Sequence, residues 1–405
     1  MAVIAVISTM DTKGREAEFL RDRIAAGGHQ ALLLDVSTLG SPVGEPDIAS
    51  DTILSKTPPE RLERMKSGAK EDIVAAMAQG AARILEEQAG DGQIDGVIGI
   101  GGNQGSAIAA TAMRALPLGF PKFLVSTVAS QNIRPFIGHK DIAVMFSVSD
   151  FVGGTNIVST SVLSNCAAAM IGMVESGTRI ERSSAKKTVA ISALGNTEKA
   201  VNRAVDRLQE LGFETVAFHA SGAGGSAMEE LIDEGLIDAV LDLTPHEVTE
   251  EIMQVGIYAP VRSGRLTAAI GKGIPMVVAT GGMEYICFGP RSSIPEELQK
   301  RTIYMHNPYN ANLKINHQEL GRVAEELATR LNQSYGKVSL LVPTNGWSIY
   351  GSDGGPFHDP EGIQLFIERM RKRLSDTVEL QVLDRNINDP EFVDACVERL
   401  VEYLE

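Results

Sequence analysis

The chain has 405 residues, and its 52 acidic and 37 basic side chains give a formal net charge of −15. We therefore exclude nucleic acid and anionic membrane surfaces as general partners, because both are bound by clustered Lys and Arg. A chain of this length exceeds what one hydrophobic core supports, so we expect two domains. We expect no apolar run to reach the roughly 20 residues that a membrane helix needs. We also expect a cytoplasmic protein.

The first half alternates apolar strands with helical segments. A strand at 3–7 precedes a helix at about 13–26, a stop at Gly27 and Gly28, and a second strand at 31–36. After a helical insertion at about 58–88 come the strands IDGVIGI, KFLVST and DIAVMFSV, with the helix AIAATAMRAL between the first two. Continuous apolar strands are typical of parallel sheets covered by helices on both faces. This alternation predicts a doubly wound α/β sheet.

The second half repeats this plan after an interruption. A long helix over TNIVSTSVLSNCAAAMIGMVES carries small residues on most faces, and we expect it to pack between domains or across a dimer. The polar, basic stretch RIERSSAKK follows, and then VAISALGNTEKAVNRAVDRLQELGFETVAFHAS restarts the order of strand, loop, helix, glycine and strand. We therefore predict two Rossmann-like, doubly wound parallel-sheet domains of related design, at 1–182 and 186–405.

Ligands of open parallel sheets bind beyond the carboxyl ends of the strands, so we searched the loops that follow them. In the first half, the loop at 99–106 opens a helix whose dipole and N–H groups favour phosphate. The loop lacks GxGxxG spacing and the chain lacks GxxxxGK[ST], so a plain strand-to-helix turn is an equal alternative. Lys13 would pair with phosphate; Asp11 would hold Mg²⁺ or cap its helix. The predicted nucleotide-binding residues are Thr9, Asp11, Thr12, Lys13, Asp35, Gly101, Gly102, Asn103, Gly105, Ser106 and Thr127.

In the second half the same rule selects loops rich in imidazoles and carboxylates. Such groups at one sheet edge would build a divalent metal site or a general acid/base pair, although local hydrogen bonding is the commoner role of a loop histidine. These groups are His219, His246, His306 and His358, beside Glu229, Glu247, Asp353 and Asp359. Arg262 and Arg265 would bind a carboxylate or phosphate, or form surface ion pairs. The hypothetical catalytic residues are His219, Glu229, His246, Arg265 and His306, with the metal ligands left unassigned.

The stretch AFHASGAGGSAMEEL places a glycine loop between a strand and a helix. It lacks the lysine of a nucleotide triphosphate loop, and it follows the second strand of its domain, whereas the dinucleotide fingerprint follows the first. We predict that Ser221, Gly222, Gly224 and Gly225 cradle a small anion. The lone tryptophan, Trp347, lies in a glycine-rich loop and would either stack on a planar ligand or be buried.

The three cysteines, Cys166, Cys287 and Cys396, are far apart and form no CxxC pair. This spacing suits a reducing compartment and argues against a disulfide scaffold or a thiolate zinc site. We expect all three thiols to be inert.

Several longer runs carry a family resemblance: DTKG, GVIGIGG, AMRALPLGFPKFLVSTVAS, DIAVMFSVSD, FHASGAGGSAMEELI, RLTAAIGKGIPMVV, HNPYN and NDPEF. They resemble the uncharacterised protein family typified by the ATP-binding N-terminal region of the tomato mosaic virus resistance protein. The resemblance covers the whole chain and implies two Rossmann-like subdomains, a homodimer, and ATP bound with Mg²⁺. It assigns the phosphate loop to Gly101–Ser106. This chain departs from the family at Gln104, where a glycine is expected, and at Glu284 and Cys287, where an Asp and an Asn are expected.

Three functions remain open from the sequence. The first is an ATP-binding protein that holds nucleotide at the glycine loop of the N-terminal domain. The second is an enzyme acting on a small anionic metabolite, a carboxylate or phosphate, in the cleft between the domains. The third is an interaction protein regulated by nucleotide. The resemblance does not imply a particular reaction, so the sequence leaves open whether the chain is an enzyme.

Overall fold

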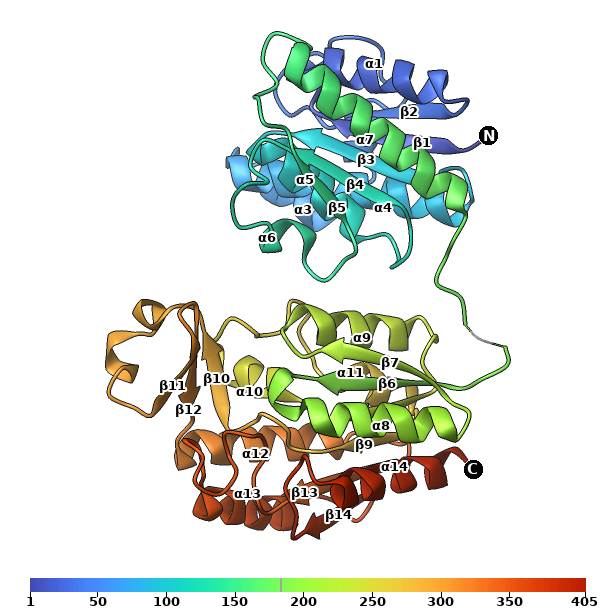
Figure 1. Cartoon of the computed structure of the whole chain (residues 1–405). Helices are drawn as coiled ribbons and strands as arrows, with labels where there is room; N and C mark the ends of the chain where they lie inside the picture. Colours follow the sequence, from blue (N-terminus) through green and yellow to red (C-terminus); the bar gives the residue numbers. More distant parts are fainter. Residues whose placement is uncertain (183) are drawn as a thin grey trace. The chain divides into compact units, whose positions relative to one another are not determined.

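A computed structural model describes residues 1–182 and 184–405. Internal contacts divide the chain into two compact units, Met1–Ile180 and Glu181–Glu405, here called unit 1 and unit 2. Each has a parallel sheet with helices on both faces (Figure 1). The predicted α/β class with doubly wound sheets is therefore confirmed.

Unit 1 is built on a five-stranded parallel sheet of order β2-β1-β3-β4-β5. Its strands are β1 (Val3–Ser8), β2 (Gln30–Asp35), β3 (Gly96–Gly101), β4 (Lys122–Ser126) and β5 (Ala143–Phe146). Its helices are α1 (Met10–Ala26), α2 (Ser50–Ser55), α3 (Pro59–Met65), α4 (Lys70–Gly90), α5 (Asn103–Arg114), α6 (Arg134–Ile137) and α7 (Ile157–Ser176). Alternate strand residues bury into two apolar cores, one shared with α4 and α5 and the other with α1 and α7.

Helix α7 belongs to the core of unit 1. It is long and apolar enough to cross a membrane, in contrast to the expectation that no such run exists. However, it packs on α1, β3 and β4 and buries Leu163, Cys166 and Met170 against them. These contacts are those of a helix that closes one face of its own sheet; packing between domains or across a dimer, expected from the sequence, stays a prediction.

Unit 2 contains a six-stranded parallel sheet of order β14-β13-β9-β8-β6-β7. Its strands are β6 (Thr188–Ala193), β7 (Glu214–His219), β8 (Ala239–Asp242), β9 (Met276–Val278), β13 (Val338–Pro343) and β14 (Val378–Leu383). Its α-helices are α8 (Glu198–Glu210), α9 (Ala223–Asp233), α10 (His246–Met253), α11 (Thr267–Lys272), α12 (His317–Leu331), α13 (Pro360–Arg373) and α14 (Pro390–Leu404). The 3₁₀ helices are η1 (Gly195–Thr197), η2 (Arg291–Ser293) and η3 (Glu296–Leu298).

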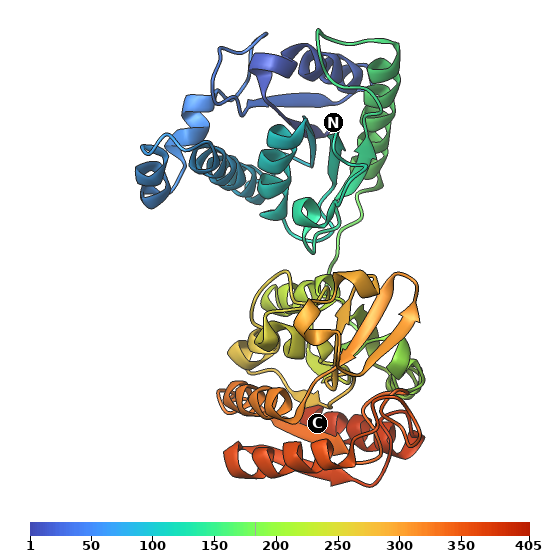
Figure 2. The same cartoon turned by 90° about the vertical axis from the view of Figure 1, so that its left-hand side faces the viewer.

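An antiparallel sheet of order β10-β12-β11 is inserted between β9 and β13. It consists of β10 (Tyr285–Phe288), β11 (Ile303–Asn307) and β12 (Asn310–Lys314), shown in orange in Figure 2. His306, which begins the run HNPYN, was predicted to lie in a loop at the edge of the parallel sheet. Instead, this run contains the tight turn between β11 and β12, so His306 lies on a strand.

Both units have the same topological switch point. In unit 1 the first strand lies between the second and the third, and the corresponding strands of unit 2, β7-β6-β8, have the same order. Connections leaving the two central strands diverge to opposite sides, so a crevice opens beyond their carboxyl ends. Ligands of open α/β sheets bind in this crevice, which makes the loops after β1 and β3, and after β6 and β8, the first places to examine.

Candidate functional site

The glycine loop after β3 meets the loop after β1 at the switch point of unit 1. A side-chain carbon on Gly105 would lie 3.7 Å from the Thr9 hydroxyl, and one on Gly102 would lie 3.6 Å from the Thr127 hydroxyl. The sequence thus correctly grouped three strand ends at one edge. The N-terminus of α5 has no side-chain cap, so its first N–H groups face this edge without a capping oxygen from the chain.

The two glycines at the start of this loop have different roles. A Cβ on Gly101 would lie 2.7 Å from the backbone of Gly105 and Ser106, so this position requires glycine for close packing of strand and helix. A Cβ on Gly102 would meet no atom closer than the Thr127 hydroxyl. Gly102 is therefore dispensable for packing, and the space above its backbone remains open to a ligand.

Several residues predicted to touch nucleotide are instead used inside the protein. The Ser106 hydroxyl is buried and hydrogen-bonded to the Ser126 hydroxyl at 2.6 Å. Asp35 is 1% exposed, and its Oδ1 accepts hydrogen bonds from the N–H of Met10 and the N–H and hydroxyl of Ser37. These two side chains hold the strand ends together, and Oδ2 of Asp35 is buried with no hydrogen-bond partner among the described residues.

The remaining members of the predicted set lie at the rim of the switch point. The Gln104 amide donates to the Thr38 hydroxyl at 3.0 Å, which ties its side chain towards the loop after β2. Thr12 donates to the backbone carbonyl of Thr9, and the first turn of α1 departs from helical geometry at Lys13, with φ −130° and ψ 22°. Asn103 is exposed, and the side chains of Asp11 and Lys13 are half-buried.

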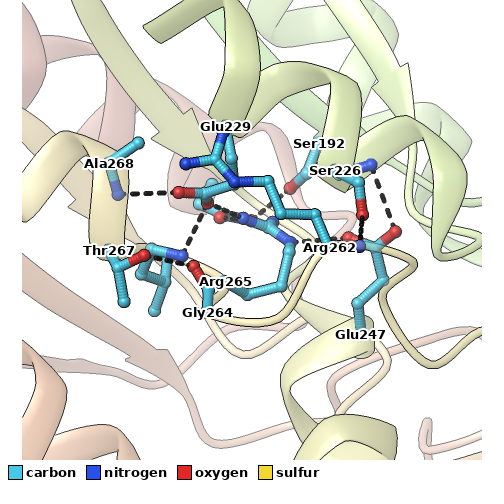
Figure 3. A network of polar contacts seen from close by, with 12 residues as sticks. Ser192, Ser226, Glu229, Glu247, Arg262, Gly264, Arg265, Thr267 and Ala268 are labelled. Atoms are coloured by element: carbon cyan, nitrogen blue, oxygen red, sulfur yellow. Dashed lines mark hydrogen bonds and ion pairs between the residues drawn. The ribbon is translucent and has the colours of Figure 1, made fainter. Parts of the chain in front are cut away.

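In unit 2, Arg265 lies at the centre of a buried network of charges (Figure 3). Its guanidinium binds Glu247 through Nε at 2.6 Å, Asp242 through Nη2 at 2.8 Å and Glu229 through Nη1 at 2.5 Å. Arg265, Glu247 and Asp242 are 0% exposed, and Glu229 is 1% exposed. Burial alone would lower the pKa of Arg265, but the three carboxylates raise it above its usual value. The charges of Arg265 and Glu229 are therefore paired inside the protein, and neither side chain faces a ligand.

The glycine loop at 221–225, which was predicted to bind a small anion, binds the Glu247 carboxylate of this network. The N–H groups of Gly222 and Gly225 both donate to Oε1 of Glu247. The position predicted for a small anionic ligand is thus taken by a carboxylate of the chain itself. Gly224 packs on the backbone of His219, where a Cβ would lie 2.1 Å from the carbonyl oxygen, while the Ser221 hydroxyl donates to that carbonyl. The loop is an internal anion cradle at the start of α9.

A cavity of about 170 Å³ opens at the carboxyl ends of β6 and β7, between the parallel and antiparallel sheets. It brings together two of the predicted catalytic residues, His219 and His306, with residues that the sequence analysis did not select. The His306 Nδ1 lies 3.0 Å from the Tyr350 hydroxyl. The other lining residues are Leu194, Gly195, Asn196, Tyr258, Tyr285, Cys287, Asn310 and Asn312.

Beside this cavity, His246 and Glu250 form a compact buried cluster with Cys287, which also lines the cavity. Their ligand atoms all lie within 4.8 Å of one another. The His246 Nδ1 lies 2.6 Å from the Gly282 carbonyl, and its Nε2 lies 3.0 Å from Oε1 of Glu250. Of these three residues, only His246 was predicted to be functional, and Cys287 was expected to be inert. The signal that it missed is the i, i+4 spacing of His246 and Glu250, which places both on one face of α10.

Burial and mutual contact shift the pKa values in this region. Burial raises the pKa of the Cys287 thiol, against the effect of His246. Burial alone would lower the pKa of His246, but neighbouring Cys287 and Glu250 raise it well above its usual value. Burial also raises the pKa of Glu284 to about 7; its Oε1 accepts a hydrogen bond from Ser348, and its Oε2 has no hydrogen-bond partner among the described residues.

The other predicted side chains lie away from the cavity. Asp359 caps α13 and pairs with Lys314 and His317, while the His358 Nδ1 lies 3.4 Å from the Gly351 carbonyl. Arg262 pairs with Asp233 at the surface, as the alternative interpretation expected. Trp347 is 2% exposed and donates to the Pro343 carbonyl, so it is buried and does not form a stacking platform.

Comparison with known proteins matches both units to one family. The family model described as "Uncharacterised protein family (UPF0261) N-terminal domain" matches residues 2–179, and the corresponding C-terminal domain model matches residues 186–404. A UPF0261 protein of Clostridium tetani (strain Massachusetts / E88) is 35% identical over 403 residues, 99% of each chain. One of Rhizobium meliloti (strain 1021) is 32% identical over 399 residues, 98% of each chain.

The predicted resemblance to the tomato protein holds. The ToMV resistance protein Tm-1(GCR237) of Solanum lycopersicum is 36% identical over 335 residues, which is 81% of this chain and 44% of the tomato protein. Among solved structures, a putative UDP-N-acetylglucosamine 2-epimerase from Listeria monocytogenes is 11% identical over 68% of this chain and 78% of its own, with a TM-score of 0.21. A likeness at that level says nothing about function.

Proposed function

The chain belongs to the uncharacterised protein family UPF0261, and we propose from its geometry that it binds ATP at the switch point of unit 1. The observation that carries the proposal is the convergence of two loops there. The uncapped N-terminus of α5 and the open backbone at Gly102 lie at the edge where β1 also ends. Backbone N–H groups and a helix dipole at a switch point favour phosphate.

Two features of the loop support phosphate over a plain turn. A turn that served packing alone needs glycine at Gly101, where a Cβ would collide with the backbone, but it does not need one at Gly102. The side chain of Gln104, which would otherwise stand over the loop, is bonded to Thr38. Both arrangements leave the backbone N–H groups accessible to an anion.

The loop after β1 supplies the complementary charges. Lys13 lies in the distorted first turn of α1, where its ammonium would neutralise phosphate. Asp11 has its N–H fixed by the Ser37 hydroxyl at 2.9 Å, and its half-buried carboxylate would hold Mg²⁺ directly or through water. Thr9 and Thr127 would add hydroxyl groups on either side of the phosphate.

Titration calorimetry with ATP and Mg²⁺ tests the proposal, using a matched pair of glycine variants. We expect Gly102→Val to fold normally and to weaken ATP binding at least tenfold, because its side chain enters the proposed phosphate position. Gly101→Ala should instead lower the stability of unit 1, because its Cβ meets backbone. Lys13→Met should weaken binding without changing stability. The absence of binding heat at millimolar ATP, or unchanged affinity in Gly102→Val, would overturn the proposal.

A further inference from the structure

The cluster of His246, Glu250 and Cys287 in unit 2 has the composition of a metal site, and no role has been assigned to it. One nitrogen, one oxygen and one sulfur atom, from α10 and β10, lie within 4.8 Å of one another. In a tetrahedral zinc site, metal–ligand bonds of about 2.0 to 2.3 Å place ligand atoms roughly 3.5 Å apart. The spacing of the three atoms is therefore compatible with a shared ion.

The surrounding hydrogen bonds orient the imidazole and the carboxylate for coordination, while the Cys287 thiol donates to Oδ1 of Asn312 at 3.4 Å. The Gly282 carbonyl can only accept, so the Nδ1 of His246 carries the proton and its Nε2 is directed towards the cluster. The Glu250 carboxylate accepts the N–H of Cys287 at Oε1 and the N–H of Tyr258 at Oε2, both at 2.6 Å. Partners of this kind, which fix the ring tautomer and orient the carboxylate, are typical of metal ligands.

The charge and burial of the three groups also favour an ion. His246 and Glu250 are 0% exposed and Cys287 is 6% exposed. A buried carboxylate and thiolate are costly unless a cation compensates them, and a divalent ion would bring the neutral imidazole, carboxylate and thiolate to zero net charge. A bound metal would also keep the thiol deprotonated.

We propose that His246, Glu250 and Cys287 bind one divalent ion of the zinc class. Thiolate and imidazole ligands together select Zn²⁺ or the chemically similar Co²⁺ over Mg²⁺ and Ca²⁺, which prefer oxygen. Three protein ligands leave a fourth position, and Cys287 also lines the cavity of about 170 Å³. That position would face His219, His306 and the amides of Asn310 and Asn312, where a water molecule or a small polar substrate would complete the coordination.

This proposal is independent of the nucleotide site of unit 1, since it uses only residues of unit 2 and a different class of metal. The alternative to a metal site is an ion pair between His246 and Glu250 beside an inert Cys287 thiol, and the distances in the cluster fit that arrangement too. A metal bound through sulfur has a spectroscopic signature that an ion pair lacks. Co²⁺ is therefore the decisive probe.

The experiment strips the full chain of metal with a chelator, adds Co²⁺, and measures bound metal by elemental analysis and absorption. We expect one Co²⁺ per chain with a thiolate-to-cobalt charge-transfer band in the near ultraviolet. Cys287→Ala should abolish the band, and Glu250→Gln should weaken Co²⁺ binding at least tenfold. The matched control is Cys396→Ala, which removes an equally buried thiol from the apolar core of the same unit and should retain the band.

Each other outcome decides against the site. Less than 0.1 equivalent of Co²⁺ or Zn²⁺ per wild-type chain at micromolar concentration would overturn the proposal without any variant, as would a band that persists in Cys287→Ala. Because the wild-type measurement stands alone, a failure of Cys287→Ala to fold does not leave the question undecided. If the wild-type chain shows the cobalt band but does not bind ATP, the nucleotide proposal for unit 1 is overturned and the metal proposal for unit 2 stands.

Discussion

The backbone N–H of Gly225 donates to Oε1 of Glu247 at 3.1 Å, and a Cβ on this glycine would lie 1.7 Å from Oε2 of the same carboxylate. Glycine is thus required here for the approach of the buried anion, in addition to its role in the turn. We predict that Gly225→Ala lowers the free energy of unfolding of unit 2 by about 3 kcal/mol, because the buried carboxylate must move away from its donors. Chemical denaturation followed by Trp347 fluorescence measures this change.

The control for this prediction is Gly271→Ala. Gly271 lies in α11 of the same unit, and a Cβ there meets nothing within 4 Å. Alanine in an exposed helix should be neutral or stabilise the unit by up to about 1 kcal/mol. If the two variants behaved alike, the internal anion cradle would not contribute to stability.

Removal of Arg265 should be among the most destabilising single changes in unit 2. Arg265→Met leaves Glu229, Asp242 and Glu247 without their shared cation, and an uncompensated buried charge costs about 3 to 5 kcal/mol. The matched control, Arg203→Met, breaks a solvent-exposed pair with Asp394 and should cost far less, because water screens such a pair. Equilibrium denaturation of both variants checks the contrast, and a loss below 1 kcal/mol in Arg265→Met would contradict it.

Glu284 should make unit 2 less stable as the pH rises. Burial raises its pKa from the usual 4.5 to about 7, against the lowering effects of Ser348, His246 and Lys314. Below pH 4.5 the carboxyl is neutral in both the folded and unfolded states, so its stabilising contribution is fully present. As the pH rises from 4.5 through 7, the carboxyl ionises in the unfolded state while burial keeps it protonated in the folded state, and roughly 3 kcal/mol of this contribution is lost.

The variant Glu284→Gln isolates this effect because its side chain cannot ionise. We expect the wild type to lose stability relative to Glu284→Gln as the pH is raised from 4 to 8. Denaturation series at each pH provide the difference between the two proteins. A difference that stays constant over this range would show that Glu284 does not titrate as described.

The emission of Trp347 should report on unit 2 alone. The indole is 2% exposed, donates from Nε1 to the Pro343 carbonyl at 3.1 Å and packs against Phe366 at 4.9 Å between ring centroids. We predict a blue-shifted emission that acrylamide quenches weakly and that shifts to the red when unit 2 unfolds. Strong quenching of the native protein by acrylamide would contradict the buried position of the indole.

The class of fold and the grouping of strand ends in unit 1 follow from local patterns. Continuous apolar strands separated by helices predict a parallel sheet, and the edge rule correctly brought Thr9, Gly102 and Thr127 to neighbouring strand ends. These inferences succeed because strand periodicity and loop position depend on residues that are close in sequence. Local patterns thus indicate the edge of the sheet where a ligand would bind. That this ligand is a nucleotide stays a prediction.

The sequence by itself determined two parallel α/β units and the loops at their strand ends, while only the tertiary structure decided what those loops hold. The pattern at Ser221–Gly225 correctly indicates an anion cradle, yet Glu247, which lies more than 20 residues later, occupies it. Cys287 was predicted to be inert because the three cysteines are far apart in sequence and form no CxxC pair, whereas folding brings it to His246 and Glu250. A local pattern shows which hydrogen-bond donors a segment has. Their acceptors lie on segments that are distant in sequence and come close only when the sheet folds.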